Sequence, residues 1–216
     1  MRTGSAIALA FVLAAGIAAR TQEIEPITFD PTDGKWILLQ ARIDAHAPML
    51  TACALASACR TGPAMEQWHT LVGEAARRRG TARLAYVNAA VNRIVHWRSD
   101  HDNYGLDDYW AMPIETLMRG GDCEDFAILK YALLAASGVP EPCLRIVVGQ
   151  IKSIAGNQDH AWLALFRDGV WHALDCKFDS VIAVADYLNW LPVAAVHAET
   201  GVIYGREFSI AEILGG

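Results

Sequence analysis

The chain has 216 residues, a formal net charge of −6 and hydrophobic residues at 53% of its positions. This length and composition suit one domain of ordinary size with a substantial core. The acidic balance, with no basic run longer than Arg77-Arg78-Arg79, argues against nucleic acid as the main partner, because neutralising phosphates requires clustered Lys and Arg. It also disfavours a role on an anionic lipid surface.

The N-terminus has the pattern of an export signal. Arg2 supplies a positive charge, residues 6–15 form an uncharged apolar run, and Ala18 and Ala19 provide small residues for cleavage. The run is shorter than the roughly 20 residues that span a bilayer, so a permanent anchor is disfavoured. We therefore expect a signal peptide over residues 1–19 and an exported mature chain.

Five cysteines are present, at Cys53, Cys59, Cys123, Cys143 and Cys176. An exported compartment permits disulfides, and an odd count leaves at least one thiol unpaired. No CxxC and no paired Cys/His spacing occurs, so a structural zinc site is not expected. Cys53 and Cys59 either bridge each other or are two small buried residues, and the sequence leaves both readings open.

The first part of the chain has helical periodicity, with apolar residues three to four positions apart. Gly138 and Pro140 stop the last of these helices, Gly as a left-handed cap and Pro as a breaker. In order, we expect one helix and a loop over residues 36–58, helices over 65–79 and 86–95, a polar loop over 100–108, and a helix over 123–136.

The second part of the chain is typical of β-structure. Apolar runs over residues 144–151, 161–166 and 170–174 predict three strands. Asp168-Gly169 between two apolar runs predicts a two-residue hairpin turn, which pairs Arg167 with Val170. Helices followed by an antiparallel sheet make an α+β fold.

The segment Gly120-Gly121-Asp122-Cys123-Glu124-Asp125 predicts a thiol at the start of a helix. The glycines allow a tight turn, Asp122 is a suitable N-cap, and Asp125 three residues later completes a variant of the capping box. The helix dipole and free N–H groups favour a thiolate and could also bind an oxyanion. A buried cysteine at an ordinary helix start explains the motif equally well, and the acidic neighbours oppose ionisation unless a cation neutralises them.

The hairpin register also brings His160 and Asp175 together. Paired residue numbers sum to 337, so His160 would face Lys177, and Asp175 would lie diagonally beside His160 on the same sheet face. An imidazole–carboxylate contact would fix the histidine tautomer, as a base for Cys123 requires. A surface histidine and an aspartate at a strand end would be the alternative.

The combination of a cysteine at a helix start with a histidine and an aspartate on adjacent strands indicates a catalytic triad more specifically than either part does alone. Here the chain resembles the LapG-like group of bacterial transglutaminase-like cysteine proteases. The resemblance runs from about Ala82 to Asp175, and its most specific piece is the DCEDFA run at residues 122–127. The other matching pieces are Tyr104-Gly105, Asp108-Tyr109-Trp110, Pro113-Ile114-Glu115, Leu144–Val148 and His160–Ala164.

The resemblance implies a papain-like, transglutaminase-type core over residues 20–216, with Cys123 as nucleophile, His160 as base and acid, and Asp175 as orienting residue. It also implies calcium held by Asp122, Glu124 and Asp125, since hard carboxylate oxygens suit this ion. Members of this group act in the periplasm and cut near the N-terminus of a giant surface adhesin. An inner-membrane receptor for cyclic di-GMP sequesters them, which links them to biofilm attachment.

Two features depart from the family pattern: Cys176 stands where Asn is expected after Asp175, and the turn before Asp122 is short. Trp110 would either assist an oxyanion hole or pack in the core, and Asp100, Asp102, Asp107 and Asp108 fit a solvated loop better than a calcium shell. The rival functions are transglutaminase-type acyl transfer, which shares the first half-reaction, and a catalytically silent calcium-binding module.

Overall fold

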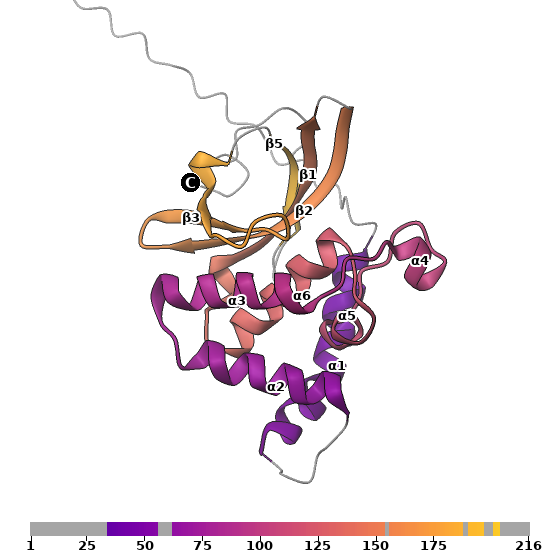
Figure 1. Ribbon diagram of the computed structural model, residues 1–216, viewed down its shortest axis with the longest axis vertical. Helices are drawn as coiled ribbons and strands as arrows, with labels where there is room; N and C mark the ends of the chain where they lie inside the picture. Colours follow the sequence, from indigo (N-terminus) through magenta and orange to yellow (C-terminus); the bar gives the residue numbers. More distant parts are fainter. Residues whose placement is uncertain (1–33, 56–61, 154–155, 188–189, 197–200, 204–216) are drawn as a thin grey trace, which may run out of the picture.

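The computed structural model describes residues 34–55, 62–153, 156–187, 190–196 and 201–203. The expected signal peptide and Cys59 lie outside the described part, as does the side chain of Cys53, so the two readings of this cysteine pair stay as predicted. Figure 1 shows helices packed against one side of an antiparallel sheet. The α+β prediction is confirmed.

Helices occupy the first part of the described chain, as the periodicity predicts. The bounds of α6 match the prediction, because Gly120-Gly121 and Gly138 interrupt the helix on either side. The elements are α1 (Lys35–Leu55), α2 (Pro63–Ala76), α3 (Gly80–Ile94), α4 (Asp100–Tyr104), α5 (Pro113–Arg119), α6 (Cys123–Ala136) and the 3-10 turn η1 (Glu141–Cys143).

The segment expected as a polar loop over 100–108 begins instead with the one-turn helix α4. The Ser99 hydroxyl accepts a hydrogen bond from the Asp102 N–H at 3.2 Å and caps its start. Gly105, with φ 68°, ends it in the left-handed conformation. This short helix turns the side chain of Asp100 toward the interior, where it is buried.

The sheet has the strand order β4-β3-β2-β1-β5-β6, and every neighbouring pair is antiparallel. Long strands β1 and β2 form its centre, and the short 3-10 turn η2 (Val184–Asp186) follows β4. The strands are β1 (Leu144–Ser153), β2 (Gly156–Arg167), β3 (Val170–Leu174), β4 (Ile182–Ala183), β5 (Trp190–Val196) and β6 (Gly201–Ile203).

The β2–β3 hairpin has the predicted register, with Arg167 paired with Val170. Asp168 and Gly169 have φ values of 52° and 78°, as a two-residue turn with both central residues left-handed requires. The predicted pair between His160 and Lys177 does not form, because β3 ends at Leu174 and the chain turns away.

Alternation along β2 divides the core into two layers. Leu163 and Leu165 pack against the helices, and α6 lies at the centre of that layer. Trp162 and Ala164 point to the opposite face, where Tyr187 packs against them. Burial of Leu163 contributes about 2 kcal/mol relative to exposure. Trp162 is fully buried on the opposite face, so burial fixes the orientation of both faces of β2.

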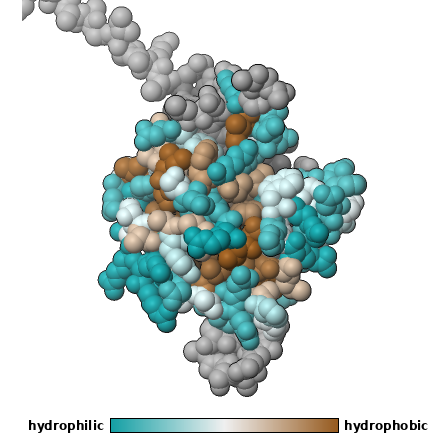
Figure 2. All heavy atoms as spheres, in the orientation of Figure 1, coloured by the Kyte–Doolittle hydropathy of each residue, from teal (hydrophilic) through white to brown (hydrophobic). Residues whose placement is uncertain are grey.

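The visible face in Figure 2 mixes hydrophobic side chains with a surrounding majority of hydrophilic ones. Isolated exposed apolar residues are ordinary on a folded chain. In the described part of the chain, no helix combines the length and apolar character needed to cross a membrane.

Candidate active site

A fixed turn places Cys123 at the first position of α6. The Gly121 N–H donates to the His96 carbonyl at 3.2 Å, and the Gly121 carbonyl accepts from the Arg98 N–H at 2.9 Å. A Cβ added to Gly121 would lie 2.5 Å from the Asp125 Cβ, so only glycine fits there. The turn before the thiol is therefore anchored through both backbone groups of Gly121.

The predicted side-chain cap from Asp122 is wrong, because its carboxylate makes no capping hydrogen bond to α6. The reciprocal half of the capping box is present: the Asp125 carboxylate accepts a hydrogen bond from the Asp122 backbone N–H. It also accepts one from the Ala111 N–H at 2.8 Å. Asp125 thus ties the start of α6 to the loop before α5.

The surroundings of Cys123 keep its thiol protonated. Burial is the main cause that raises its pKa, and the neighbouring Glu124 carboxylate raises it further. The thiol donates to Glu124 Oε2 at an Sγ–O distance of 3.3 Å. A backbone hydrogen bond from Ala161 acts in the opposite direction and places the sulfur beside the peptide that follows His160. A cation beside these carboxylates would offset their effect on the pKa of the thiol.

His160 and Asp175 form a buried pair, as the hairpin register predicts. The His160 Nε2 lies 2.8 Å from Asp175 Oδ2. The Tyr187 hydroxyl donates to the same oxygen, and the Lys177 N–H donates to Oδ1 at 2.7 Å. Burial alone would raise the pKa of Asp175, but the His160 contact and these hydrogen bonds lower it. The carboxylate is therefore ionised and fixed in orientation.

Cys123 and His160 line the same cavity, which has a volume of about 970 Å³. Asp175, the partner of His160, is not among the residues that line it. Trp97 and Trp110 also contribute to the cavity wall, and Trp97 is exposed whereas Trp110 is buried in the core. Trp110 thus packs in the core, as one of the two alternatives expects, and also lines the cavity that holds Cys123.

An acidic cluster lies next to Cys123. Carboxylate oxygens of Asp100, Asp122 and Asp125 lie within 4.8 Å of one another, and those of Asp100, Asp108 and Glu124 do so as well. Asp100 joins both groups and is only 2% exposed, so the expectation that it belongs to a solvated loop is wrong. Asp100 was missed because the sequence carries no signal that separates it from the exposed Asp102 and Asp107.

The oxygens of this cluster fit a calcium ion. Asp100 Oδ1, Asp122 Oδ1 and Asp125 Oδ2 are buried and have no hydrogen-bond partner among the described residues. Burial, together with neighbouring carboxylates, raises the pKa of Asp125 to about 8 and that of Glu124 well above its usual range. Several buried carboxylate oxygens that lack donors are the donor set that calcium prefers.

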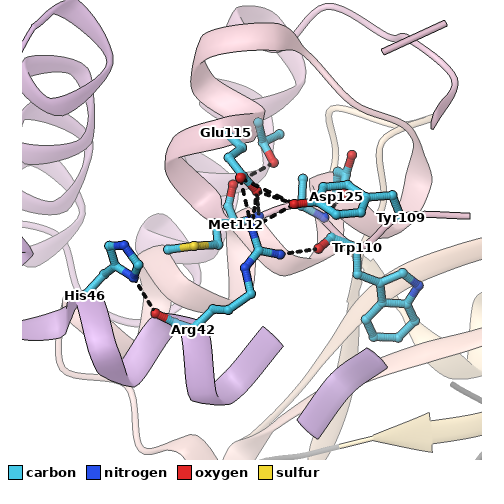
Figure 3. Close-up of polar contacts among 9 residues, drawn as sticks. Arg42, His46, Tyr109, Trp110, Met112, Glu115 and Asp125 are labelled. Carbon is cyan, nitrogen blue, oxygen red and sulfur yellow. Dashed lines mark hydrogen bonds and ion pairs between the residues drawn. The ribbon is translucent and has the colours of Figure 1, made fainter. Parts of the chain in front are cut away.

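Figure 3 shows a polar network that supports the loop leading to this cluster. Arg42 Nη2 donates to both carboxylate oxygens of Glu115, at 2.8 and 2.7 Å, and to the Tyr109 hydroxyl at 2.8 Å. Glu115 Oε2 accepts from the Met112 N–H at 2.8 Å. Ala111, which binds Asp125, lies between these residues, so helix α1 contributes to the position of the acidic site.

A comparison with models of known protein families identifies the family of this chain. The model of the bacterial transglutaminase-like cysteine proteinase family, BTLCP, matches residues 53–187, which include Cys123, His160 and Asp175. The chain belongs to this family. The predicted resemblance to the BTLCP proteinases is thereby confirmed, together with the transglutaminase-like fold.

Solved structures of another BTLCP proteinase agree with this assignment. Calcium-bound LapG of Legionella pneumophila is 27% identical, with a TM-score of 0.58 over 76% of this chain and 91% of that one. EGTA-treated LapG of the same organism is 27% identical, with a TM-score of 0.57 over 73% and 84%. The comparison with curated proteins gave no match.

Proposed function

We propose that this BTLCP proteinase is a calcium-dependent cysteine endopeptidase with Cys123 as nucleophile, His160 as general base and acid, and Asp175 as orienting residue. The observation that carries the proposal is the buried His160–Asp175 pair at the same cavity as the thiol of Cys123. The hydrogen bond from Ala161 to the sulfur supports it, because Ala161 directly follows His160.

One residue of the chain, His160, accepts or donates the proton in each step of the proposed reaction. With Nε2 directed to Asp175, the Nδ1 atom of His160 is the one that takes the thiol proton from Cys123. The thiolate attacks a peptide carbonyl, and N–H groups at the start of α6 stabilise the oxyanion. His160 then protonates the leaving amine, and water, deprotonated by the same imidazole, hydrolyses the thioester.

We propose that Asp122, Glu124 and Asp125 hold the calcium ion, with Asp100 and Asp108 added from the structure. Bound calcium would offset the carboxylate charge that raises the pKa of Cys123 and so favour the thiolate. The calcium-bound and EGTA-treated forms of the LapG relative support the choice of ion.

We further propose that the protein acts in the periplasm, after export by the segment at residues 1–19. The family resemblance supports a large surface adhesin as the substrate, cleaved in its N-terminal region. It also supports an inner-membrane cyclic di-GMP receptor as the partner that controls access to the adhesin and hence biofilm attachment.

The mature chain should be incubated with the N-terminal region of a candidate adhesin, with calcium or with EGTA, and the fragments weighed by mass spectrometry. We expect cleavage only with calcium, loss of cleavage in Cys123→Ala, and normal cleavage in the control Cys143→Ala, whose thiol lies at another pocket. Activity that survives in Cys123→Ala would refute the assignment. Incorporation of a labelled amine in place of water would redirect it to acyl transfer.

A further inference from the structure

Cys176 lies beside the two residues assigned to proton transfer. It follows Asp175 where the chain leaves β3, and its thiol is free. One ring nitrogen of His160, one carboxylate oxygen of Asp175 and the sulfur of Cys176 all lie within 4.8 Å of one another. His160 and Cys176 also line the catalytic cavity, which gives an ion from solvent a path to these two residues, and Asp175 lies next to His160 outside that lining.

The donor set differs in kind from the acidic cluster around Asp100. A thiolate, an imidazole and a carboxylate suit zinc, whereas calcium selects oxygen atoms. With Zn–N of about 2.0 Å and Zn–S of about 2.3 Å, tetrahedral donors lie roughly 3.3–3.8 Å apart. The three donor atoms lie within 4.8 Å of one another, and the His160–Asp175 hydrogen bond of 2.8 Å would open around the ion to reach that spacing, with the cavity beside His160 and Cys176 leaving a fourth position for water.

We propose that His160, Asp175 and Cys176 form a zinc site that inhibits the enzyme reversibly. The inhibition rests on the proposed catalytic function, whereas the metal binding does not. A zinc ion there takes a nitrogen of His160 and an oxygen of Asp175, so the imidazole can no longer exchange a proton with Cys123. Cys123 is not a ligand of this site.

The environment of Asp175 supports a ligand role, because the Lys177 N–H holds Oδ1 at 2.7 Å and fixes the carboxylate. Burial, with Asp175 adding to it and Lys130 opposing it, raises the pKa of Cys176 to about 12. Zinc must therefore displace the thiol proton, which leaves to solvent as the Zn–S bond forms, and zinc bound at Nε2 leaves the neutral imidazole with its one proton on Nδ1. The two positive charges of the bound zinc ion are balanced by one thiolate and one carboxylate.

Cobalt(II) serves as the spectroscopic probe for this site, added to the full chain with saturating calcium to fill the acidic cluster. We expect a thiolate-to-cobalt absorption band with one equivalent bound, displaced by zinc. The band should remain in Cys123→Ala and in the control Cys143→Ser. Cys176→Ser, and Cys176→Ala as a second variant, should lose the band. Their affinity for zinc should fall by more than the roughly 10–100-fold that loss of an outer-shell partner causes.

The outcomes separate this site from simple capture of the nucleophile. A band lost in Cys123→Ala but kept in Cys176→Ser would show that Cys123 and His160 bind the metal, and it would overturn the proposal. The absence of any band in the wild type would overturn it as well. Zinc inhibition of adhesin cleavage should be relieved in Cys176→Ser. Were the chain to cleave no substrate, the cobalt spectrum would still decide whether the metal site exists.

Discussion

His160 Nε2 lies 2.8 Å from Asp175 Oδ2, and both side chains are almost fully buried. Tyr187 donates to the same carboxylate oxygen from the far face of the sheet. The imidazole is therefore fixed in orientation by a charged acceptor that is itself fixed. A protein without a catalytic use for this pair would gain little from burying a carboxylate here.

Substitution Asp175→Asn should lower kcat by about 10²–10⁴-fold, because the amide no longer stabilises the imidazolium or selects its tautomer. Tyr187→Phe removes one hydrogen bond and keeps the carboxylate, so its loss should be much smaller. Steady-state kinetics on a peptide substrate, with folding checked by circular dichroism, measures both. An Asp175→Asn enzyme with normal kcat would show that the pair is only structural.

Without calcium, stability should fall as the pH rises from about 5 to 8. The fold raises the pKa of Asp125 to about 8 and raises that of Glu124, so the unfolded chain releases these protons at a lower pH than the folded chain does, and each such release costs stability. Calcium should remove the decline, and Asp100→Asn should raise the Tm in EGTA while weakening calcium binding at least about 10-fold. Thermal unfolding with EGTA and with calcium tests this, and identical pH profiles would contradict it.

Gly121→Ala should destabilise the protein by about 1–3 kcal/mol and reduce activity, because the new methyl group would overlap the Asp125 side chain. Gly73→Ala is the matched control. Gly73 lies within α2 with open space at its Cβ position, so the substitution should stabilise by up to about 1 kcal/mol. Urea unfolding of both variants gives the comparison, and equal stability of the two would refute the proposed packing of the turn.

Lys130→Met should stabilise the protein by about 1–3 kcal/mol at pH 7. Lys130 is fully buried in α6, its Nζ has no hydrogen-bond partner within the described ranges, and burial lowers its pKa to about 8. The unfolded chain holds this proton up to a higher pH, so wild-type stability gains from deprotonation above pH 8. The advantage of the variant should therefore shrink between pH 8 and 10 in denaturant titrations, and a destabilised variant would indicate an essential charge.

Local signals in the sequence were sufficient for the hairpin and for α6. Asp168-Gly169 sets a two-residue turn, and that turn fixes which residues of β2 and β3 face each other. The register brings the end of β3 near His160, and Asp175 makes its contact from the turn directly after Leu174. The bounds of α6 follow from glycines that interrupt the helix at both ends.

The site features that the sequence did not predict are set by contacts between residues far apart in the chain. Asp100 is buried with its carboxylate beside those of Asp122 and Asp125 at the start of α6, and no feature of residues 100–108 reveals this. Asp122 joins the carboxylate cluster instead of capping its own helix, which local propensity does not foresee. Tyr187 reaches Asp175 from a turn after β4 that carries no recognisable motif.

Labelling with a peptide-like electrophile, located by mass spectrometry, tests the role of the thiol and its imidazole most directly. The wild type with calcium should be modified at Cys123 and not at Cys143 or Cys176, and EGTA or His160→Ala should slow the reaction at least about 100-fold. Preferential labelling of Cys143 or Cys176, or undiminished labelling of Cys123 in His160→Ala, would contradict a nucleophile activated by that histidine.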